Sequence, residues 1–398
     1  MTLAKRVKII EPSPTLELIA IAKNMKQQGL EVIEFGAGEP DFNTPENIKE
    51  AGINAIKNNF TRYTANPGIK ELRDAICEKL YKENGLEYSP NQVIVSSGAK
   101  HSLFNAIMAL CDVGDEVLVP APYWVTYPEL VKIADGVPVI IPTTGETNYK
   151  ITPEQLEEYI TPRTKILILN SPSNPAGAVY TEDELRKIAE ICVNHQIYVI
   201  SDEIYEKLIY DGEKHVSIAS FNEDIKKLTV TLNGVSKAFA MTGWRIGYAA
   251  AELEIAKAMD AFQSHATSAP SSISQKASYE ALVGDQTAVN AMVREFDKRR
   301  KFMAQKISEI PGITCQVPKG AFYIFPEISG LLGKTIAGVK ITDDSVFAKL
   351  LLEKVYVVAV PGSSFGSPGN LRFSYANSME NIQKGLERID ELISTSME

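Results

Sequence analysis

The middle of this chain alternates short apolar runs with amphipathic segments, and this pattern limits the possible folds most strongly. The runs, rich in valine, isoleucine and leucine, lie at 93–97, 116–120, 165–170, 197–201 and 228–233. Such nearly continuous runs are typical of parallel strands buried on both faces. Segments 152–160 and 181–192 open with capping boxes, which indicate helices. We therefore predict an α/β fold whose large domain is a three-layer α/β/α sandwich around a mostly parallel sheet.

The two ends of the chain have a different pattern. Residues 287–310 predict a long charged helix, and 320–328 and 370–376 predict strands. A chain of 398 residues is also too long for one small core. We therefore predict a large domain at 46–285 and a smaller α+β domain formed by 1–45 together with 286–398.

Charge and composition exclude several classes of protein. A net charge of −9 argues against a nucleic acid or an anionic membrane as partner. No run approaches the roughly 18 apolar residues of a membrane helix, and no apolar signal core follows the basic start, so we expect a cytoplasmic protein. The scattered cysteines and histidines have no metal-ligand spacing, so we expect neither a metal site nor a disulfide framework.

Unusual residues follow each predicted strand, at the edge where open parallel sheets bind ligands. The first run leads into small residues at a helix start, where backbone N–H groups bind anions such as phosphate. The residues after the five runs are, in order, Gly98-Ala99-Lys100, Trp124, Asn174, Asp202 with Tyr205, and Lys237.

Arg245 is predicted to join the same edge. Only seven residues separate it from Lys237, and it begins the next apolar run, 245–251. A parallel crossover needs about a dozen residues, so that strand is predicted to be antiparallel and to start where its neighbours end. Its guanidinium could then bind a phosphate bidentately.

Together these residue types suit pyridoxal phosphate. A lysine can form the Schiff base, and an aspartate beside the pyridine nitrogen keeps the ring an electron acceptor. A phenol and an amide can bind the ring oxygen, and an indole can stack on the ring. Each residue alone has an ordinary explanation: Lys237 could reach solvent, Asp202 could cap a turn and Trp124 could be core. Their shared position at one edge favours the cofactor.

The stretch "SKAFAMTGWRIG" (236–247) resembles the Schiff-base signature of class I aminotransferases. Further stretches follow in the family's order along almost the whole chain, and their detail is similar to bacterial aspartate aminotransferases. They are "GAGEPDFNTP" (36–45), "YTANPGIKELR" (63–73), "SGAK" (97–100), "APYWVTYPE" (121–129), "NSPSNPAG" (170–177), "SDEIYE" (201–206), "GAFY" (320–323) and "LRFSYA" (371–376).

The resemblance implies a fold-type I pyridoxal phosphate enzyme and a role for each matching residue. Lys237 would carry the cofactor and move a proton from the substrate Cα to the cofactor C4′. Asp202 would hold the pyridine nitrogen, Tyr205 and Asn174 the ring oxygen, and Trp124 would stack on the ring. The phosphate would be bound by Gly98, Ala99, Lys100, Ser236 and Arg245, and by Tyr63 of a neighbouring subunit in a homodimer.

The substrate would be bound by residues from both ends of the chain. Arg372 would hold the α-carboxylate beside Gly38, with Trp124 and Asn174 nearby, and Lys100 would meet a distal carboxylate. Two positions depart from the family: a serine three residues before the lysine is Gly234 here, and "NPTG" reads "NPAG" with Ala176.

The expected activity is ping-pong amino transfer between an L-amino acid, with aspartate favoured, and 2-oxoglutarate. Aromatic amino acids or prephenate remain open as alternatives. A pyridoxal phosphate lyase or decarboxylase on the same scaffold and a non-catalytic sensor module are weaker alternatives.

Overall fold

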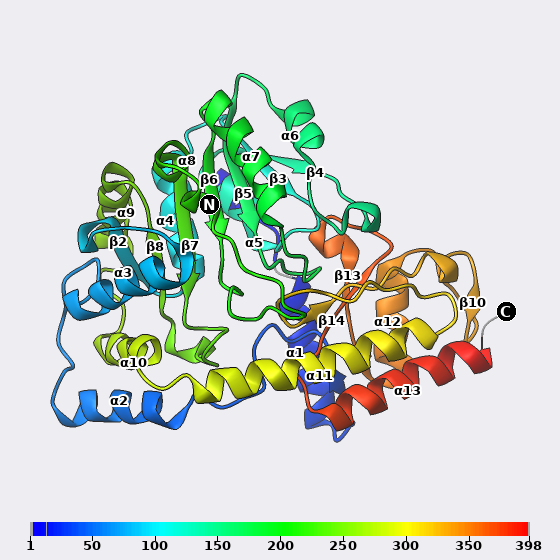
Figure 1. The fold of residues 1–398 in the computed structure, drawn as a ribbon. Helices are drawn as coiled ribbons and strands as arrows, with labels where there is room; N and C mark the ends of the chain where they lie inside the picture. The colour runs from blue at the N-terminus through cyan, green and yellow to red at the C-terminus, as the bar shows by residue number, and fades with distance from the viewer. Residues whose placement is uncertain (1–2, 13, 397–398) are drawn as a thin grey trace.

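The computed structural model describes residues 3–12 and 14–396, and a seven-stranded sheet forms its centre (Figure 1). The strands run in the spatial order β2-β8-β7-β6-β5-β3-β4. Strand β8 is antiparallel to both of its neighbours, and the remaining pairs are parallel. The mostly parallel sheet and the antiparallel last strand predicted from the sequence are therefore confirmed. The strands are β2 (Val93–Ser96), β3 (Glu116–Pro120), β4 (Val137–Ile141), β5 (Thr164–Asn170), β6 (Tyr198–Asp202), β7 (Thr229–Gly234) and β8 (Gly247–Ala250).

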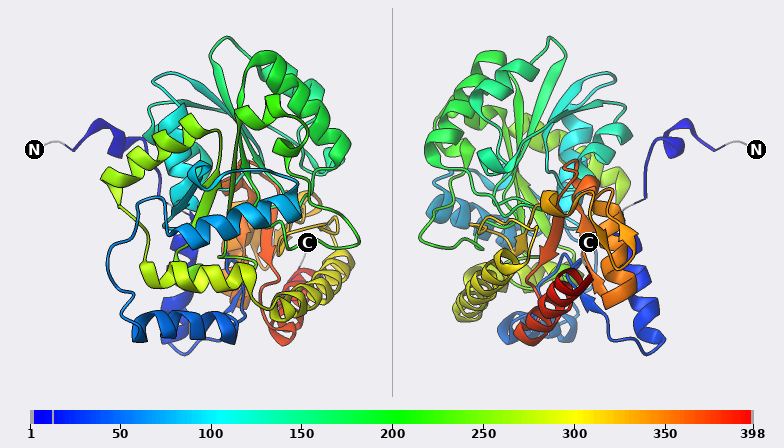
Figure 2. Two further views of the ribbon diagram at one scale, coloured as in Figure 1. Left: turned by 60° about the vertical axis from the view of Figure 1, so that its left-hand side comes forward. Right: turned by 90° about the vertical axis from the view of Figure 1, so that its right-hand side faces the viewer.

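The strands are rich in apolar residues because both faces of the sheet are covered. Along β5, Ile166 and Ile168 pack into a core cluster that includes Leu103 and Ile107 of helix α4 (Ala99–Leu110). The alternate residues of β5 pack into a second cluster with the apolar face of helix α7 (Glu182–His195). Figure 2 shows helices on both sides of the sheet. This is the predicted three-layer arrangement, in which most strand residues are buried on one face or the other.

The helices begin where their capping residues indicate. The Thr152 and Thr181 boxes open α6 and α7, and Gly98 precedes α4 with a φ of 91°, a conformation that favours glycine. The other helices between residues 46 and 283 are α2 (Glu46–Lys57), α3 (Lys70–Asn84), α5 (Thr126–Ile133), α6 (Pro153–Tyr159), α8 (Glu223–Leu228), α9 (Leu253–Ala266) and α10 (Ser272–Val283).

The two ends of the chain meet beside the large sheet. Strand β1 (Ile33–Glu34) pairs in parallel with β12 (Val357–Val358), and β13, β14 and β9 form a three-stranded antiparallel sheet. The domain boundaries at 45/46 and 285/286 stay predictions. The further elements are α1 (Pro14–Gln27), α11 (Thr287–Glu309), β9 (Tyr323–Ile324), β10 (Thr335–Ile336), β11 (Val339–Lys340), α12 (Asp344–Val355), β13 (Val360–Pro361), β14 (Leu371–Ser374) and α13 (Met379–Ser396).

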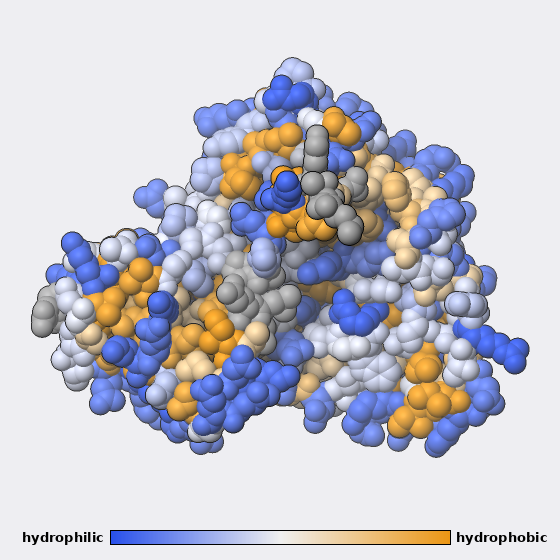
Figure 3. Space-filling model, turned by 180° about the vertical axis from the view of Figure 1, so that it is seen from behind, coloured by the Kyte–Doolittle hydropathy of each residue, from blue (hydrophilic) through white to orange (hydrophobic). Residues whose placement is uncertain are grey.

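The surface is mixed in character. Seen from behind, it is mostly hydrophilic, with hydrophobic side chains gathered in separate patches (Figure 3). Among the helices that the structure describes, none combines the length and the apolar character needed to span a membrane.

Candidate active site

A pocket of about 540 Å³ opens at the carboxyl ends of the parallel strands. The parallel strands other than β4 contribute residues at or just beyond their ends, and the antiparallel β8 contributes Arg245 just before its start. Residues from both chain ends, Gly38 and Arg372 among them, complete the wall. The predicted site residues that line it are Gly38, Ala99, Lys100, Trp124, Asn174, Asp202, Tyr205, Ser236, Lys237, Arg245 and Arg372.

Two predicted site residues do not line the pocket in this single chain. Gly98 lies behind the wall, where an added Cβ would come within 2.3 Å of Nη2 of Arg245. Glycine at this position is what allows the guanidinium to approach the start of α4. Tyr63 is 99% exposed.

Lys237 lies at the base of the pocket, shortly after the end of β7. Its ammonium donates a hydrogen bond of 2.5 Å to the backbone oxygen of Gly38, which comes from the N-terminal part of the chain. Burial, with Arg372 and Arg245 acting in the same direction, lowers the pKa of Lys237 to about 8, although the carboxylates of Glu39 and Asp202 oppose the shift. An amine with this pKa is partly neutral near physiological pH, as a nucleophile or a proton carrier must be.

Gly234, where the family often has serine, has a steric explanation here. A Cβ at this position would lie 2.9 Å from the Cα of Gly247 and 3.0 Å from the oxygen of Ile246. Strand β8 therefore passes too close to β7 for any side chain at residue 234.

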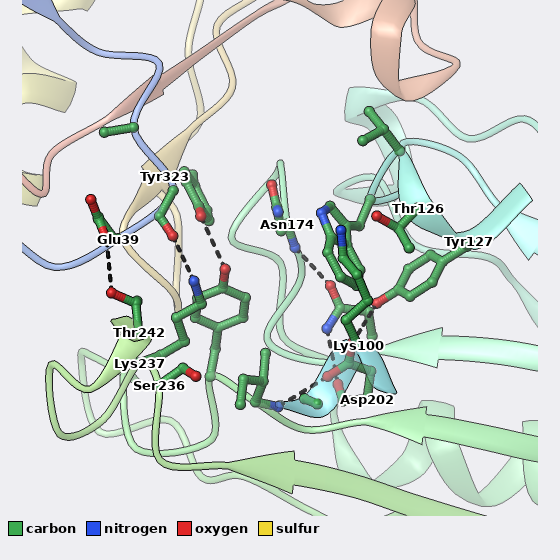
Figure 4. A pocket seen from close by; sticks show the side chains of 18 of the residues that line it. Glu39, Lys100, Thr126, Tyr127, Asn174, Asp202, Ser236, Lys237, Thr242 and Tyr323 are labelled. Carbon is green, nitrogen blue, oxygen red and sulfur yellow. Dashed lines mark hydrogen bonds between the residues drawn. The ribbon is translucent and has the colours of Figure 1, made fainter. Parts of the chain in front are cut away.

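Asp202 ends strand β6 and is 5% exposed. Its Oδ2 accepts a 2.8 Å hydrogen bond from the Tyr127 hydroxyl, and its Oδ1 accepts a 3.3 Å bond from the Ile204 N–H. Figure 4 shows the Tyr127 hydroxyl and the Asp202 carboxylate facing each other. Burial raises the pKa of Asp202 to about 6, although both hydrogen bonds oppose that shift. A cationic N–H in the pocket would stabilise the ionised form.

Arg372 is 2% exposed, yet its partners are neutral. It donates to Oδ1 of Asn174 at 3.0 Å and to the backbone oxygen of Gly36 at 2.8 Å. Among the residues that the structure describes, its buried Nε has no hydrogen-bond partner. Burial lowers the pKa of this guanidinium. An anion at this point would supply the missing counter-charge.

The opposite side of the pocket is cationic. Arg245 donates to the backbone oxygen of Thr242 at 2.8 Å, and the Lys100 ammonium lies 4.9 Å from the centre of the Trp124 ring. Burial and the neighbouring Arg245 lower the pKa of Lys100. Together with the backbone N–H groups at the start of α4, the two cations form a candidate anion-binding site.

Several lining residues were missed by the sequence analysis. The hydroxyls of Tyr323 and Tyr205 lie 3.0 Å apart and share a hydrogen bond. Thr242 donates to Glu39 at 2.7 Å (Figure 4). Tyr127 and Tyr323 both stand inside stretches that carried the family resemblance. Because buried aromatic residues usually belong to the core, their pattern alone did not mark them as site residues.

A second group of buried polar side chains lies on the other side of β6. Glu203, Glu206 and His215 place their ligand atoms within 4.8 Å of one another, a spacing that could suit a metal ion. The Lys79 ammonium, however, forms an ion pair with Glu206. A cation of the protein itself thus neutralises this group.

Comparison with known proteins is consistent with this geometry. The family model described as "Aminotransferase class I and II" matches residues 31–389. An aspartate aminotransferase from Bacillus sp. (strain YM-2) is 49% identical over 391 residues, which cover 98% of this chain and 99% of that protein. An aspartate/prephenate aminotransferase from Nitrosomonas europaea is 46% identical over 397 residues, which cover 99% of this chain and 100% of that protein. The solved aspartate aminotransferase structure from Rhizobium meliloti has a TM-score of 0.97 at 44% identity and covers 100% of both chains.

Proposed function

This chain belongs to the class I and II aminotransferase family, and on that premise we propose that it transfers the amino group of aspartate to 2-oxoglutarate, with pyridoxal phosphate bound through Lys237. The observation that carries the proposal is the meeting, in one pocket, of Lys237 with two buried charged groups, Asp202 and Arg372. Their side-chain charges have neutral partners in the chain.

The residues present fit pyridoxal phosphate. Asp202 has a buried carboxylate that a protonated pyridine nitrogen would complement. At the other end of the pocket, a Cβ at Gly247 would lie 2.1 Å from the nitrogen of Ala99. Glycine at this position therefore lets β8 approach the start of α4, where backbone N–H groups and Arg245 can receive a phosphate. Donors for the ring oxygen, Tyr205 and Asn174, lie between these two ends.

Within this proposal each residue has a defined task. Pyridoxal phosphate supplies an electron-accepting ring that stabilises negative charge on the substrate Cα. Lys237 would hold the cofactor through its Nζ, and the same amine, in its neutral form, would move the proton between the substrate Cα and the cofactor C4′. Asp202 would hold the pyridine nitrogen protonated, and Trp124 would support one face of the ring. The same residues act in reverse with the second oxo acid, so the kinetics are ping-pong.

Substrate recognition is proposed to depend on two cations. Arg372 would hold the α-carboxylate, because its Nε is free among the described residues. Lys100 would meet a distal carboxylate, which favours a dicarboxylic substrate. An aromatic amino acid or prephenate is the second candidate, since one of the similar proteins is an aspartate/prephenate aminotransferase.

A homodimer is proposed as the working unit. The Tyr63 side chain is 99% exposed, which is uncommon for a large aromatic residue. In a dimer its hydroxyl could reach the phosphate bound by the neighbouring subunit.

The test is to follow the visible absorption of the protein loaded with pyridoxal phosphate after adding aspartate alone. We expect the yellow colour to bleach while oxaloacetate appears in an amount equal to the sites. Bleaching by phenylalanine but not by aspartate would favour the second candidate. A protein that takes up no pyridoxal phosphate would overturn the proposal.

Two variants distinguish the proposed substrate-binding roles of Arg372 and Lys100. Arg372→Ala should impair every amino-acid substrate, whereas Lys100→Leu should impair dicarboxylic substrates selectively. Equal loss for aspartate and phenylalanine in Lys100→Leu would reject its distal role.

A further inference from the structure

Tyr127 is held rigidly beside the pocket. It lies in the first turn of α5 and is 2% exposed. Its ring packs edge-on against Trp124, with centroids 5.5 Å apart and planes at 89°. The direction of its hydroxyl is therefore set by packing before any ligand binds.

The hydroxyl of Tyr127 makes the shorter of the two hydrogen bonds to the Asp202 carboxylate, 2.8 Å against 3.3 Å for the Ile204 N–H. Burial raises the pKa of Tyr127 well above 10, so the phenol stays protonated and donates. Each carboxylate oxygen has two lone pairs, and each uses one on these donors. One lone pair on each oxygen is therefore left unused by these two donors, and Asp202 lines the pocket.

The backbone of Asp202 is fixed by a separate residue. The Asn170 side chain donates to the backbone oxygen of Asp202 at 2.9 Å and accepts from the backbone N–H of Asn174 at 2.8 Å. This clamp joins the ends of β5 and β6. Removing the Tyr127 hydroxyl would thus release the carboxylate, whose terminal torsion is soft, and leave the strand end in place.

We propose that Tyr127 is a positioning residue, whose hydroxyl orients the Asp202 carboxylate and favours its ionised form, so that it can hold a protonated pyridine nitrogen. This inference rests on the proposed function. Without the phenol, the carboxylate would rotate, and its buried charge would lose a charge-assisted hydrogen bond. The consequence concerns the ring nitrogen and no other atom of the cofactor.

The experiment compares Tyr127→Phe with a matched control, Tyr210→Phe. Tyr210 is 4% exposed and donates its hydroxyl to the backbone oxygen of Ala321, so its variant also removes one buried hydrogen bond. For each protein, freed of cofactor, we would measure the dissociation constants of pyridoxal phosphate and of the analogue with C–H in place of the ring nitrogen. Thermal unfolding would verify that each variant is folded.

We expect Tyr127→Phe to bind pyridoxal phosphate about tenfold more weakly than the wild type, the equivalent of one charge-assisted hydrogen bond. Its affinity for the analogue should equal that of the wild type, and Tyr210→Phe should change neither. Equal losses for both compounds, or the same selective loss in Tyr210→Phe, would overturn the inference.

A second measurement uses Asp202→Asn. In that background the Tyr127→Phe change should no longer affect pyridoxal phosphate affinity, because the group on which it acts is neutral. A full tenfold effect in that background would contradict the inference. A wild type that binds pyridoxal phosphate but transfers no amino group would overturn only the proposed function, and a wild type that binds neither compound would overturn both.

Discussion

Asp202 and Glu203 are neighbours in the chain and both are buried, yet their surroundings differ sharply. Asp202 faces the pocket, where a phenol and a backbone N–H bind it. Glu203 faces the opposite side of β6 and belongs to a group of four side chains, Lys79, Glu203, Glu206 and His215, which we call the buried ion cluster. One strand end thus presents one carboxylate with neutral partners and one with ionic partners.

The pKa shifts follow this difference. In the cluster, burial alone would raise the pKa of Glu206, but Lys79 and His215 lower it to about 2. In the pocket, burial dominates, raising the pKa of Asp202 to about 6 and lowering that of Lys237 to about 8. The charges of the buried ion cluster are therefore neutralised by one another. The charges of Asp202 and Lys237 in the pocket are poorly neutralised by the chain and are suited to pairing with a ligand.

The sharpest test of this comparison is Lys237→Ala. Loss of the residue proposed to bind the cofactor and carry the proton should lower turnover by about 10⁴-fold or more. The free energy of unfolding should not fall, because a poorly compensated charge is removed. Turnover and urea unfolding check the two parts, with the exposed Lys257→Ala as control. Turnover within tenfold of the wild type would contradict the assignment.

Lys79→Met should show the opposite behaviour. It leaves Glu206 buried without its ammonium partner, and breaking a buried pair costs about 3–5 kcal/mol. Urea unfolding measures this loss, and the control is Lys82→Met, whose pair with Glu78 is exposed and should contribute less than about 1 kcal/mol. Turnover per folded molecule should stay near that of the wild type. Similar stability losses in both variants would mean that the cluster is not specially stabilising.

The sequence alone predicted six of the seven strands of the large sheet, because the signals of those strands are local. The run at 116–120 coincides with β3, and the short connection before Arg245 correctly predicts that β8 is antiparallel. Strand β4 (Val137–Ile141) was missed because it lies at the sheet edge, contains a proline and is mostly half-exposed. Strand β4 therefore lacks the continuous burial that made the other strands recognisable, including β2 at the opposite edge.

The pocket was predictable to the extent that its residues follow strand ends. The partners of those residues were not, because they are set by tertiary contacts. Tyr127 is 75 positions from Asp202 in sequence, and Lys79 comes from α3 to meet Glu206 after β6. No local spacing relates such residues, so their hydrogen bonds and pKa shifts became visible only in the fold.

Asp202→Asn should stabilise the cofactor-free protein, although it removes a carboxylate that the proposed reaction needs. In the unfolded chain this group loses its proton near pH 4, and in the folded chain at about pH 6. The folded state therefore holds the extra proton between these values, and stability falls as the pH rises through that window. We expect a gain of roughly 3 kcal/mol at pH 8 and about half of that at pH 5.

Urea unfolding of the cofactor-free proteins at both pH values measures this gain. Glu206→Gln is the matched comparison and should be destabilised at pH 8, since it removes a carboxylate that has an ionic partner. A loss of stability in Asp202→Asn at pH 8 would show that the pocket charge is compensated after all.

The smallest expected effect concerns His215, whose Nε2 lies 2.8 Å from Glu203. Burial alone would lower the pKa of this histidine, and Lys79 acts in the same direction, but Glu203 and Glu206 raise it above 6.5. A raised histidine pKa stabilises the fold fully below the unfolded value, and that stabilisation is lost as the pH rises through the folded value. His215→Gln should therefore be less stable than the wild type by about 1–2 kcal/mol at pH 6, and by less at pH 8.5.

Thermal or urea unfolding at the two pH values measures the stability difference between His215→Gln and the wild type. The other titrating groups are the same in both proteins, so their contributions to this difference largely cancel. His195→Gln is the control, because its contact with Glu157 is exposed and should contribute little at either pH. A gap that widened with rising pH would mean that His215 is neutral in the folded protein. The buried ion cluster would then carry an uncompensated negative charge, as Asp202 does in the pocket. The two sides of β6 would no longer differ in how their charges are compensated.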